Sequence, residues 1–245
     1  AGLDDIEKNT AKMQLEGLLD TLTDAKEYGS ILNVESYNWD LLRRFVAAED
    51  TDGQISMDSV GVEDTAEQLN RLIDIGETIA RKYWVSVTNP PYMPISSASA
   101  NLNDFVNKNY IAGKTDLFSV FIEKCIAMTK KSAFVAMITM QSWMFLTSFE
   151  KIRDKILSYE ISSMIHLGAR GFDEISGEVV QTTAFILSKE HLNDRYRGEY
   201  IRLVNGISEK EKEKGFFNRD NRFVNSGANF EKIPQRLIAY WVSDT

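Results

Sequence analysis

Apolar residues recur at helical spacing through the first third of the chain. They repeat at mostly three- and four-residue steps over residues 3–25 and again over residues 39–46, which predicts two amphipathic helices. The acidic stretch 49–53 is expected to form a loop, and a third helix is expected over about residues 66–82. Residues 1–82 are therefore predicted to form a helical segment.

From residue 83 the pattern changes to short β-rich runs that alternate with helical stripes. Residues 83–88 are aromatic and β-branched and stop at Asn89-Pro90-Pro91, which predicts a strand that ends in a rigid turn. After a polar loop, a helical stripe over residues 117–126 precedes an uninterrupted apolar run at residues 133–138. Strand, helix and buried strand in this order predict a βαβ unit with a right-handed crossover.

The alternation continues further along the chain. A helix is expected over residues 149–157 with Ser148 as its cap, followed by a strand at residues 163–167. The runs 179–187 and 199–204 are both β-rich and are joined by a polar turn. We expect them to form an antiparallel pair that closes the edge of the sheet.

The end of the chain is less regular. Residues 209–215 alternate in charge and offer no apolar face, so we expect an exposed connection there, whereas the aromatic residues near Tyr240 should pack against something. The pattern as a whole predicts an α/β fold. Residues 83–205 would carry the sheet, and residues 206–245 would be a linker or extension.

Composition is that of an ordinary globular protein, with 245 residues of which 43% are hydrophobic. No apolar run approaches the roughly 18 to 20 residues that span a bilayer, and the N-terminus lacks the layout of a secretory signal. We therefore expect a cytoplasmic protein without a membrane partner. The single cysteine, Cys125, excludes an intrachain disulfide and a multi-cysteine metal site, and we predict a buried thiol and no metal.

Net charge at first argues against a nucleic-acid partner, because the chain carries −8 and phosphate binding favours Lys and Arg. The distribution of charge weakens this objection. Residues 1–88 carry 8 basic and 18 acidic side chains, whereas residues 89–155 carry 8 and 5, and residues 156–245 carry 12 and 13. The acidic side chains are therefore concentrated upstream of the turn at residue 89.

The turn Asn89-Pro90-Pro91-Tyr92 lies where an α/β sheet binds ligands, beyond the carboxyl end of a strand. The Asn89 side-chain oxygen and the Pro90 carbonyl can accept hydrogen bonds from an exocyclic amine, and the prolines fix the backbone that aims them. Two such acceptors would favour a pyramidal nitrogen whose lone pair attacks a methyl sulfonium without a covalent intermediate. Tyr92 can stack on a flipped base. The same four residues can also simply end a strand.

Further motifs accompany this turn, and with them the chain resembles the adenine-specific DNA N6-methyltransferases of BREX phage-defence systems (the PglX type), which are related to type IIG restriction-modification enzymes. The resemblance implies a class I methyltransferase sheet, of which this chain would hold the catalytic half. The matching segments, in order, are residues 87–93, 114–118 with 121–123, 135–145, 166–170 and 177–185.

The resemblance also implies roles for individual residues. The catalytic turn, which would hold the target adenine, comprises Asn89, Pro90, Pro91 and Tyr92. The wall between the adenine and the cofactor S-adenosylmethionine would include Asp116, Leu117 and Phe118, which are core helix residues under the alternative interpretation. The residues expected to contact the flipped base are Val179, Val180, Gln181 and Thr182, and candidate phosphate contacts to double-stranded DNA are Lys108 and Arg170. His166 is expected to be a hydrogen-bonded structural histidine.

One feature of that family does not occur in this sequence. A complete enzyme needs a glycine-rich turn for the cofactor, and the chain contains no G-x-G. We therefore expect a fragment of a longer protein that is inactive alone and binds S-adenosylmethionine weakly. Two alternatives stay open: protein glutamine methylation, which also uses Asn-Pro-Pro-Tyr, and a non-catalytic module that binds other defence proteins through its acidic first 88 residues.

Overall fold

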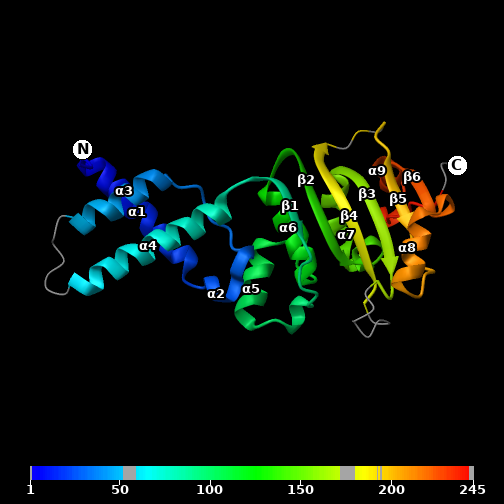
Figure 1. Cartoon of the computed structure of the whole chain (residues 1–245), viewed down its shortest axis with the longest axis horizontal. Coiled ribbons are helices and arrows are strands. Elements are labelled where there is room, and N and C mark those ends of the chain that lie inside the picture. Colours follow the sequence, from blue (N-terminus) through cyan, green and yellow to red (C-terminus); the bar gives the residue numbers. More distant parts are fainter. Residues whose placement is uncertain (1, 52–58, 172–179, 192, 194, 243–245) are drawn as a thin grey trace. The chain divides into compact units, whose positions relative to one another are not determined.

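The computed structural model describes residues 2–51, 59–171, 180–191, 193 and 195–242. It divides into two compact units, Ala1–Arg81 and Lys82–Thr245, which we call the helical unit and the sheet unit (Figure 1). None of the helices in the described ranges combines the length and apolar character needed to cross a bilayer.

The helical unit consists of α1 (Asp5–Leu22), α2 (Ala25–Tyr28), α3 (Trp39–Thr51) and α4 (Ser59–Ala80). Asp4 and Glu7 form a capping box at the start of α1. The helices expected over 3–25 and 39–46 are thereby confirmed. The loop expected at 49–53 was wrong for residues 49–51, which belong to α3, while residues 52 and 53 lie outside the described residues. α4 begins earlier than the expected residue 66. The buried core of this unit comprises Ala11, Leu15, Leu18, Leu22, Ile31, Leu32, Leu41, Leu42, Val46 and Ile73.

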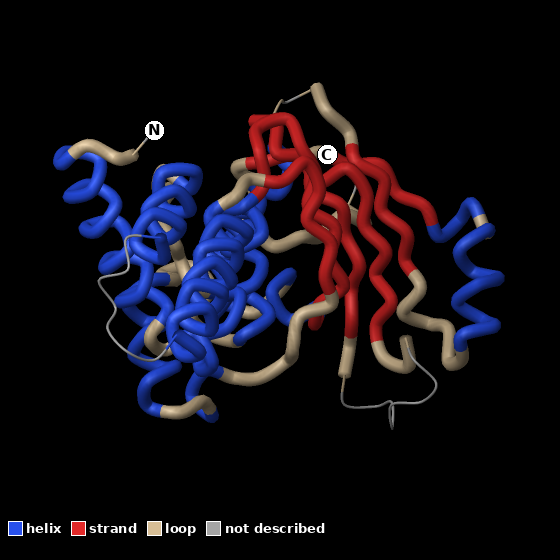
Figure 2. Tube along the Cα trace, turned by 60° about the vertical axis from the view of Figure 1, so that its left-hand side comes forward, coloured by secondary structure: helices blue, strands red, loops and turns tan. Residues whose placement is uncertain are grey.

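The sheet unit is built on six strands in the order β1-β2-β4-β3-β5-β6, which are labelled in Figure 1. Figure 2 shows the same strands in red, next to one another in the sheet. The strands are β1 (Tyr83–Thr88), β2 (Thr129–Met140), β3 (Tyr159–Gly168), β4 (Thr182–His191), β5 (Gly198–Arg202) and β6 (Arg222–Asn225). β1 and β2 are parallel and are joined through α6 (Leu117–Met128). The predicted strand–helix–strand unit is thus confirmed.

The position of β4 corrects the expected antiparallel pair of the runs 179–187 and 199–204. β4 does not pair with β5; it lies antiparallel between β2 and β3, and β5 pairs in parallel with β3. β4 is apolar on successive residues: Phe185 and Leu187 are buried on one face, while on the other face Ala184 is half-buried and Ile186 is exposed. Such a strand is suited to the interior of a sheet, where both of its edges are hydrogen-bonded.

The helices of the sheet unit include three departures from expectation. The polar loop before residue 117 contains α5 (Ala100–Asn109), which Ser99 caps and which is rich in Asn, a poor helix former. The stretch expected to be an exposed connection forms α8 (Glu209–Phe217). Ser148 does not cap α7 (Glu150–Leu157); it lies inside a preceding 3-10 turn, and Phe149 occupies the cap position.

Residues 206–242 pack with the sheet rather than apart from it. β6 extends the sheet, α9 (Gly227–Glu231) buries Phe230, and Ile238 and Tyr240 are buried. Lys212 of α8 is itself buried and donates hydrogen bonds to the carbonyls of Leu167 and Leu203 at the ends of β3 and β5. The expectation that residues near Tyr240 pack against something is confirmed.

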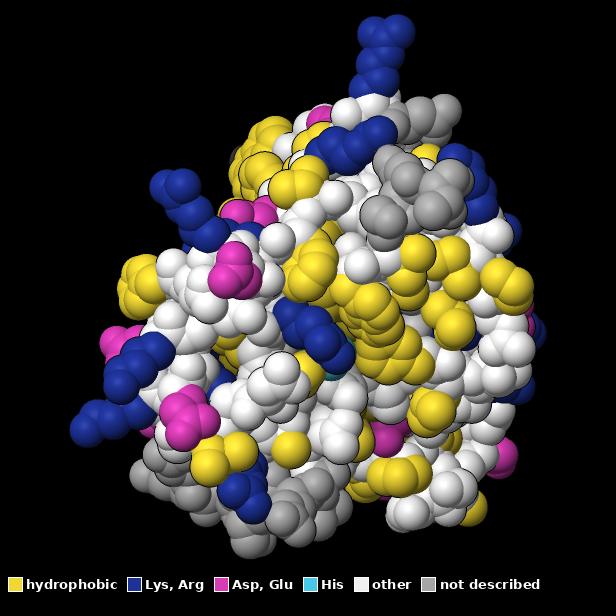
Figure 3. All heavy atoms as spheres, turned by 90° about the vertical axis from the view of Figure 1, so that its right-hand side faces the viewer, with side chains coloured by type: hydrophobic (Ala, Val, Ile, Leu, Met, Phe, Trp, Pro, Cys, Tyr) yellow, Lys and Arg dark blue, Asp and Glu magenta, His cyan; other side chains and the backbone are white. Residues whose placement is uncertain are grey.

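The two faces of the sheet differ. One face carries the main core, where Ile122, Val135 and Phe185 pack with α6 and α7, and Cys125 is buried as predicted. The other face is open and apolar, with Val87 72% and Phe134 44% exposed. Hydrophobic side chains also gather on the side that carries α8 and β6 (Figure 3), where Phe217 and Val224 are exposed.

Candidate active site

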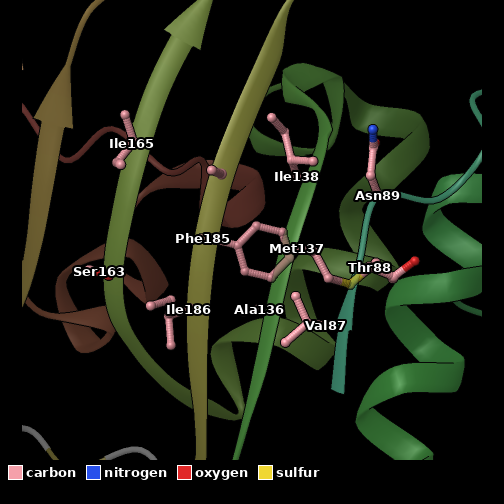
Figure 4. Close-up of a pocket in the computed structure, with 11 residues that line it drawn as sticks. Val87, Thr88, Asn89, Ala136, Met137, Ile138, Ser163, Ile165, Phe185 and Ile186 are labelled. Atoms are coloured by element: carbon pink, nitrogen blue, oxygen red, sulfur yellow. The ribbon is translucent and has the colours of Figure 1, made fainter. Parts of the chain in front are cut away.

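The turn after β1 projects from the carboxyl edge of the sheet. Thr88, the last residue of β1, pairs with Met137 of the parallel strand β2, so that both strands end at the same edge. Asn89 follows immediately and is exposed, whereas Pro90 is buried and anchors the turn. Figure 4 shows Asn89 at the end of β1, beside an open cavity of about 440 Å³ on the apolar face of the sheet.

Tyr92 holds the Asn89 side chain in place. Its hydroxyl lies 3.0 Å from Oδ1 of Asn89 and 3.4 Å from the carbonyl oxygen of Ile138 in β2. The Tyr92 ring meets Phe118 edge to face, with 6.2 Å between the ring centroids, and burial raises the pKa of its phenol above the usual value. An amide oxygen has two lone pairs, so Asn89 can accept a second hydrogen bond from a substrate while Tyr92 orients it.

Asp116 ties the start of α6 to the same turn. Its carboxylate accepts hydrogen bonds from the backbone N–H of Met93 at 3.1 Å and of Phe118 at 3.2 Å. The N–H of Leu117 donates to the carbonyl of Met93 at 2.8 Å. Burial raises the pKa of the Asp116 carboxyl, and these N–H donors oppose that shift. The predicted residues 89–92 and 116–118 are distant in the sequence, and these hydrogen bonds and ring contacts bring them together in the fold.

Phe118 lies in the core of this assembly. It is fully buried and packs against Tyr92 and Phe149, while Leu117 is half-buried. Asp116 caps the helix, so its carboxylate is already engaged by backbone donors. These contacts give Asp116 and Phe118 a positioning role for the Asn89 turn.

Residues 179–182, which were expected to contact the base, lead into β4 at the same edge of the sheet. Thr182 pairs with Met140 of β2, and the N–H of Gln141 donates to the carbonyl of Gln181 at 2.8 Å. Thr182 is buried, Val180 is half-buried and Gln181 is exposed. Val179 lies outside the described residues.

The two candidate phosphate contacts lie on other elements. Lys108 is exposed in the last turn of α5. Arg170 is exposed just beyond β3, with a positive φ of 57°. The structure thus places both cations at the surface, on separate segments from the Asn89 turn.

A second cavity, of about 410 Å³, lies at the carboxyl ends of β2, β3 and β5. Its lining includes Gln141, Phe145, His166, Gln181, Arg202 and Trp241. His166 is buried and bonded through both ring nitrogens, which confirms the expectation of a hydrogen-bonded histidine. The sequence analysis did not identify Gln141 and Arg202 as site residues. Gln141 directly follows β2 and Arg202 is the last residue of β5, so a polar residue at a strand end was the available signal.

These residues do not make a complete pocket for S-adenosylmethionine. The lining of the cavity beside Asn89 is almost wholly apolar. Asp116, the buried carboxylate closest in sequence to the turn, accepts two backbone N–H groups at its Oδ1 atom as the cap of α6. Among the described residues, the cavity beside Asn89 therefore offers few polar groups that could hold S-adenosylmethionine.

The fold is that of an amino-methyltransferase. It has a parallel β1–β2 pair with the antiparallel strand β4 beside it, and the Asn89 turn offers hydrogen-bond acceptors at the carboxyl edge of this pair. The chain belongs to the Eco57I restriction-modification methylase family, whose model matches residues 4–172. The α/β fold class expected from the sequence is thereby confirmed.

Two curated relatives share this segment. The chain is 41% identical over 226 residues to the adenine-specific methyltransferase PglX of Lacticaseibacillus casei (strain Zhang), covering 89% of the chain and 19% of that protein. It is 35% identical over 243 residues to the adenine-specific methyltransferase BrxX of Escherichia coli O9:H4 (strain HS), covering 96% and 20%. The chain thus spans about a fifth of the length of these relatives.

A solved structure has a similar fold. A chain from a type I restriction-modification complex matches with a TM-score of 0.50 at 10% identity, covering 82% of this chain and 52% of that one.

Proposed function

We propose that this chain is the adenine-binding part of a longer DNA methyltransferase that transfers a methyl group from S-adenosylmethionine to N6 of a flipped adenine in phage defence. The observation that carries the proposal is the Asn89 turn, whose side-chain oxygen is oriented by Tyr92 at the carboxyl edge of the sheet. The relatives named as adenine-specific methyltransferases support adenine as the substrate.

The chemistry that these residues supply is recognition and alignment of the amine. Asn89 Oδ1 and the Pro90 carbonyl accept the two N6 hydrogens, which directs the nitrogen lone pair out of the ring plane. S-adenosylmethionine supplies the electrophilic methyl group when bound. We propose that its pocket is completed by further segments of the protein, since this chain spans about a fifth of its relatives and contains no glycine-rich turn.

We propose the following roles for the remaining site residues. Asp116, Leu117 and Phe118 form the wall beneath the Asn89 turn and towards the cofactor. Val179, Val180, Gln181 and Thr182 lie against the flipped base, and Lys108 and Arg170 contact phosphates of the double-stranded DNA. The exposure of Gln181, Lys108 and Arg170 supports these assignments.

The test is Asn89→Ala in the full-length protein, with Asn89→Asp as the matched control. Alanine removes one of two oriented acceptors, so we expect kcat/KM for adenine methylation to fall by about 100-fold or more. Aspartate keeps an acceptor oxygen at the same place and should retain much more activity. Transfer of a labelled methyl group to host DNA by the purified proteins gives kcat/KM, methylation sequencing identifies the modified base, and thermal unfolding confirms the fold.

Equal adenine methylation by wild type and Asn89→Ala would refute the assignment and favour a non-catalytic module. Methylation of a glutamine-containing protein in place of DNA would favour the glutamine methyltransferase alternative. Both outcomes are read from the same purified proteins with a labelled methyl donor.

A further inference from the structure

A chain of hydrogen bonds connects the buried C-terminal segment to Gln181. The Tyr240 hydroxyl lies 2.9 Å from Nδ1 of His166, and Nε2 of His166 lies 2.6 Å from Oε1 of Gln141. Gln141 donates from Nε2 to Oε1 of Gln181. We call this series, from Tyr240 to Gln181, the amide relay.

Gln141 sets the direction of the amide relay. An amide oxygen can only accept, so Nε2 of His166 carries the proton and donates to Oε1 of Gln141. A neutral imidazole has one donor and one acceptor, so Nδ1 of His166 accepts from the Tyr240 hydroxyl. The ring is neutral because burial, together with Arg202 and Lys212, lowers the pKa of His166 to about 4.

The direction of the relay determines what Gln181 presents to a ligand. Oε1 of Gln181 faces the donating amide of Gln141, which directs the amide NH₂ of this exposed side chain away from the relay. Two of the relay residues are nearly inaccessible, with His166 4% and Tyr240 1% exposed. The Tyr240 ring is further fixed by stacking on Tyr200, with 5.1 Å between centroids and 8° between planes. Gln181 is therefore held as a hydrogen-bond donor.

We propose that Gln181 donates a hydrogen bond to a ring nitrogen of the flipped adenine, and that Gln141, His166 and Tyr240 are positioning residues that hold it in this orientation. The inference rests on the proposed function. Asn89 and Gln181 share one edge of the sheet, because β1 ends beside Met137 and β4 begins beside Met140. Adenine has an exocyclic amine that donates hydrogen bonds and ring nitrogens that accept them. The acceptors of Asn89 and Pro90 would bind the amine, and the donor of Gln181 would bind a ring nitrogen.

The kinetic test uses single-turnover methylation of duplex oligonucleotides by the full-length protein. The target is adenine or its 1-deaza, 3-deaza or 7-deaza analogue, each of which replaces one ring nitrogen by CH. We expect Gln181→Ala to slow methylation of adenine about 10-fold, as for loss of one hydrogen bond, and to abolish the rate difference between adenine and one of the analogues. Tyr240→Phe should reduce that same difference.

Tyr200→Phe is the matched control, because it removes a phenolic hydroxyl from the stacked partner ring outside the relay. It should leave the analogue difference unchanged. A merely structural role of Tyr240 would make Tyr240→Phe slow all four substrates equally, and this result would overturn the positioning role. If Gln181→Ala preserves every analogue difference, the base contact is wrong.

The relay can be tested separately from activity by ¹⁵N NMR of the imidazoles in the 245-residue chain, which has 2 histidines. We expect His166 as the Nε2–H tautomer in wild type, and in Tyr240→Phe the same tautomer with the Nδ1 resonance shifted by the loss of its hydrogen bond from Tyr240. The Nδ1–H tautomer in wild type would overturn the relay direction. If the full-length wild type methylates no adenine, the proposed function and the base contact fail together, while the NMR result still decides the relay.

Discussion

His166 is almost fully buried, and two cations, Arg202 and Lys212, act on its ring. Burial first, and then these charges, lower its pKa from 6.5 to about 4. The unfolded chain therefore binds more protons than the folded one between these values. The contribution of His166 to stability is present above pH 6.5 and is lost as the pH falls towards 4.

We predict that acid destabilises the protein partly through this residue. The loss between pH 6.5 and 4 should be on the order of 3 kcal/mol in the free energy of unfolding. His166→Asn should remove most of that part of the pH dependence, whereas His191→Asn, at an exposed position, serves as the control. Denaturant unfolding across this range measures it, and identical slopes for wild type and His166→Asn would contradict the prediction.

Among the elements, α7 carries one buried cation, Arg153. Its hydrogen bonds connect the segment after β2 with the segment near the end of the chain. Arg153 is fully buried and donates to the carbonyls of Trp143 and Leu146, which follow β2, and of Gln235 near the end of the chain. Burial lowers the pKa of its guanidinium. Arg153 thus holds the segment that carries Gln141 against the segment that carries Tyr240.

Arg153→Met should destabilise the sheet unit by about 3 kcal/mol, because it leaves buried carbonyls without donors. Lys151→Met, an exposed position on the same helix, should change stability little. Denaturant midpoints of the two variants give the comparison. A loss below 1 kcal/mol for Arg153→Met would mean that water or local relaxation replaces these bonds.

Helices and strands with a clear hydrophobic periodicity were predictable from the sequence, whereas the pairing of strands in the sheet was not. α1, α3, α6 and the runs of β1 and β2 follow directly from hydrophobic spacing. The α8 helix was missed because its stretch lacks an apolar stripe, and its cap, Ser208, was the signal that the sequence offered. The place of β4 depends on long-range pairing, which periodicity does not encode.

The same distinction holds for the candidate site, of which the local motif was predictable and the long-range hydrogen bonds were not. Asn89 to Tyr92 was found because prolines and a strand end mark it locally. The relay through Gln141, His166 and Tyr240 joins residues separated by 25 and 74 positions. No local pattern signals such a network, so only the fold could reveal it.

At the scale of the whole molecule, the sheet unit has a core of its own. The buried cluster around Phe118, Trp143 and Tyr200 is formed entirely by residues after Lys82. We predict that residues 82–245 expressed alone keep a cooperative thermal transition and near-ultraviolet circular dichroism from their buried aromatic rings. A broad transition with exposed hydrophobic surface would instead show that the unit needs residues 1–81.

The central place of β4 also bears on how the protein is made. β3 ends at Gly168, but β2 and β3 obtain their shared neighbour only when β4 is complete at His191. At ordinary rates of synthesis this interval lasts on the order of a few seconds. Until then the emerging chain carries two apolar strands with open edges, which is the form most prone to pair with another chain. A ribosome paused in this interval would therefore present the most aggregation-prone intermediate of the sheet.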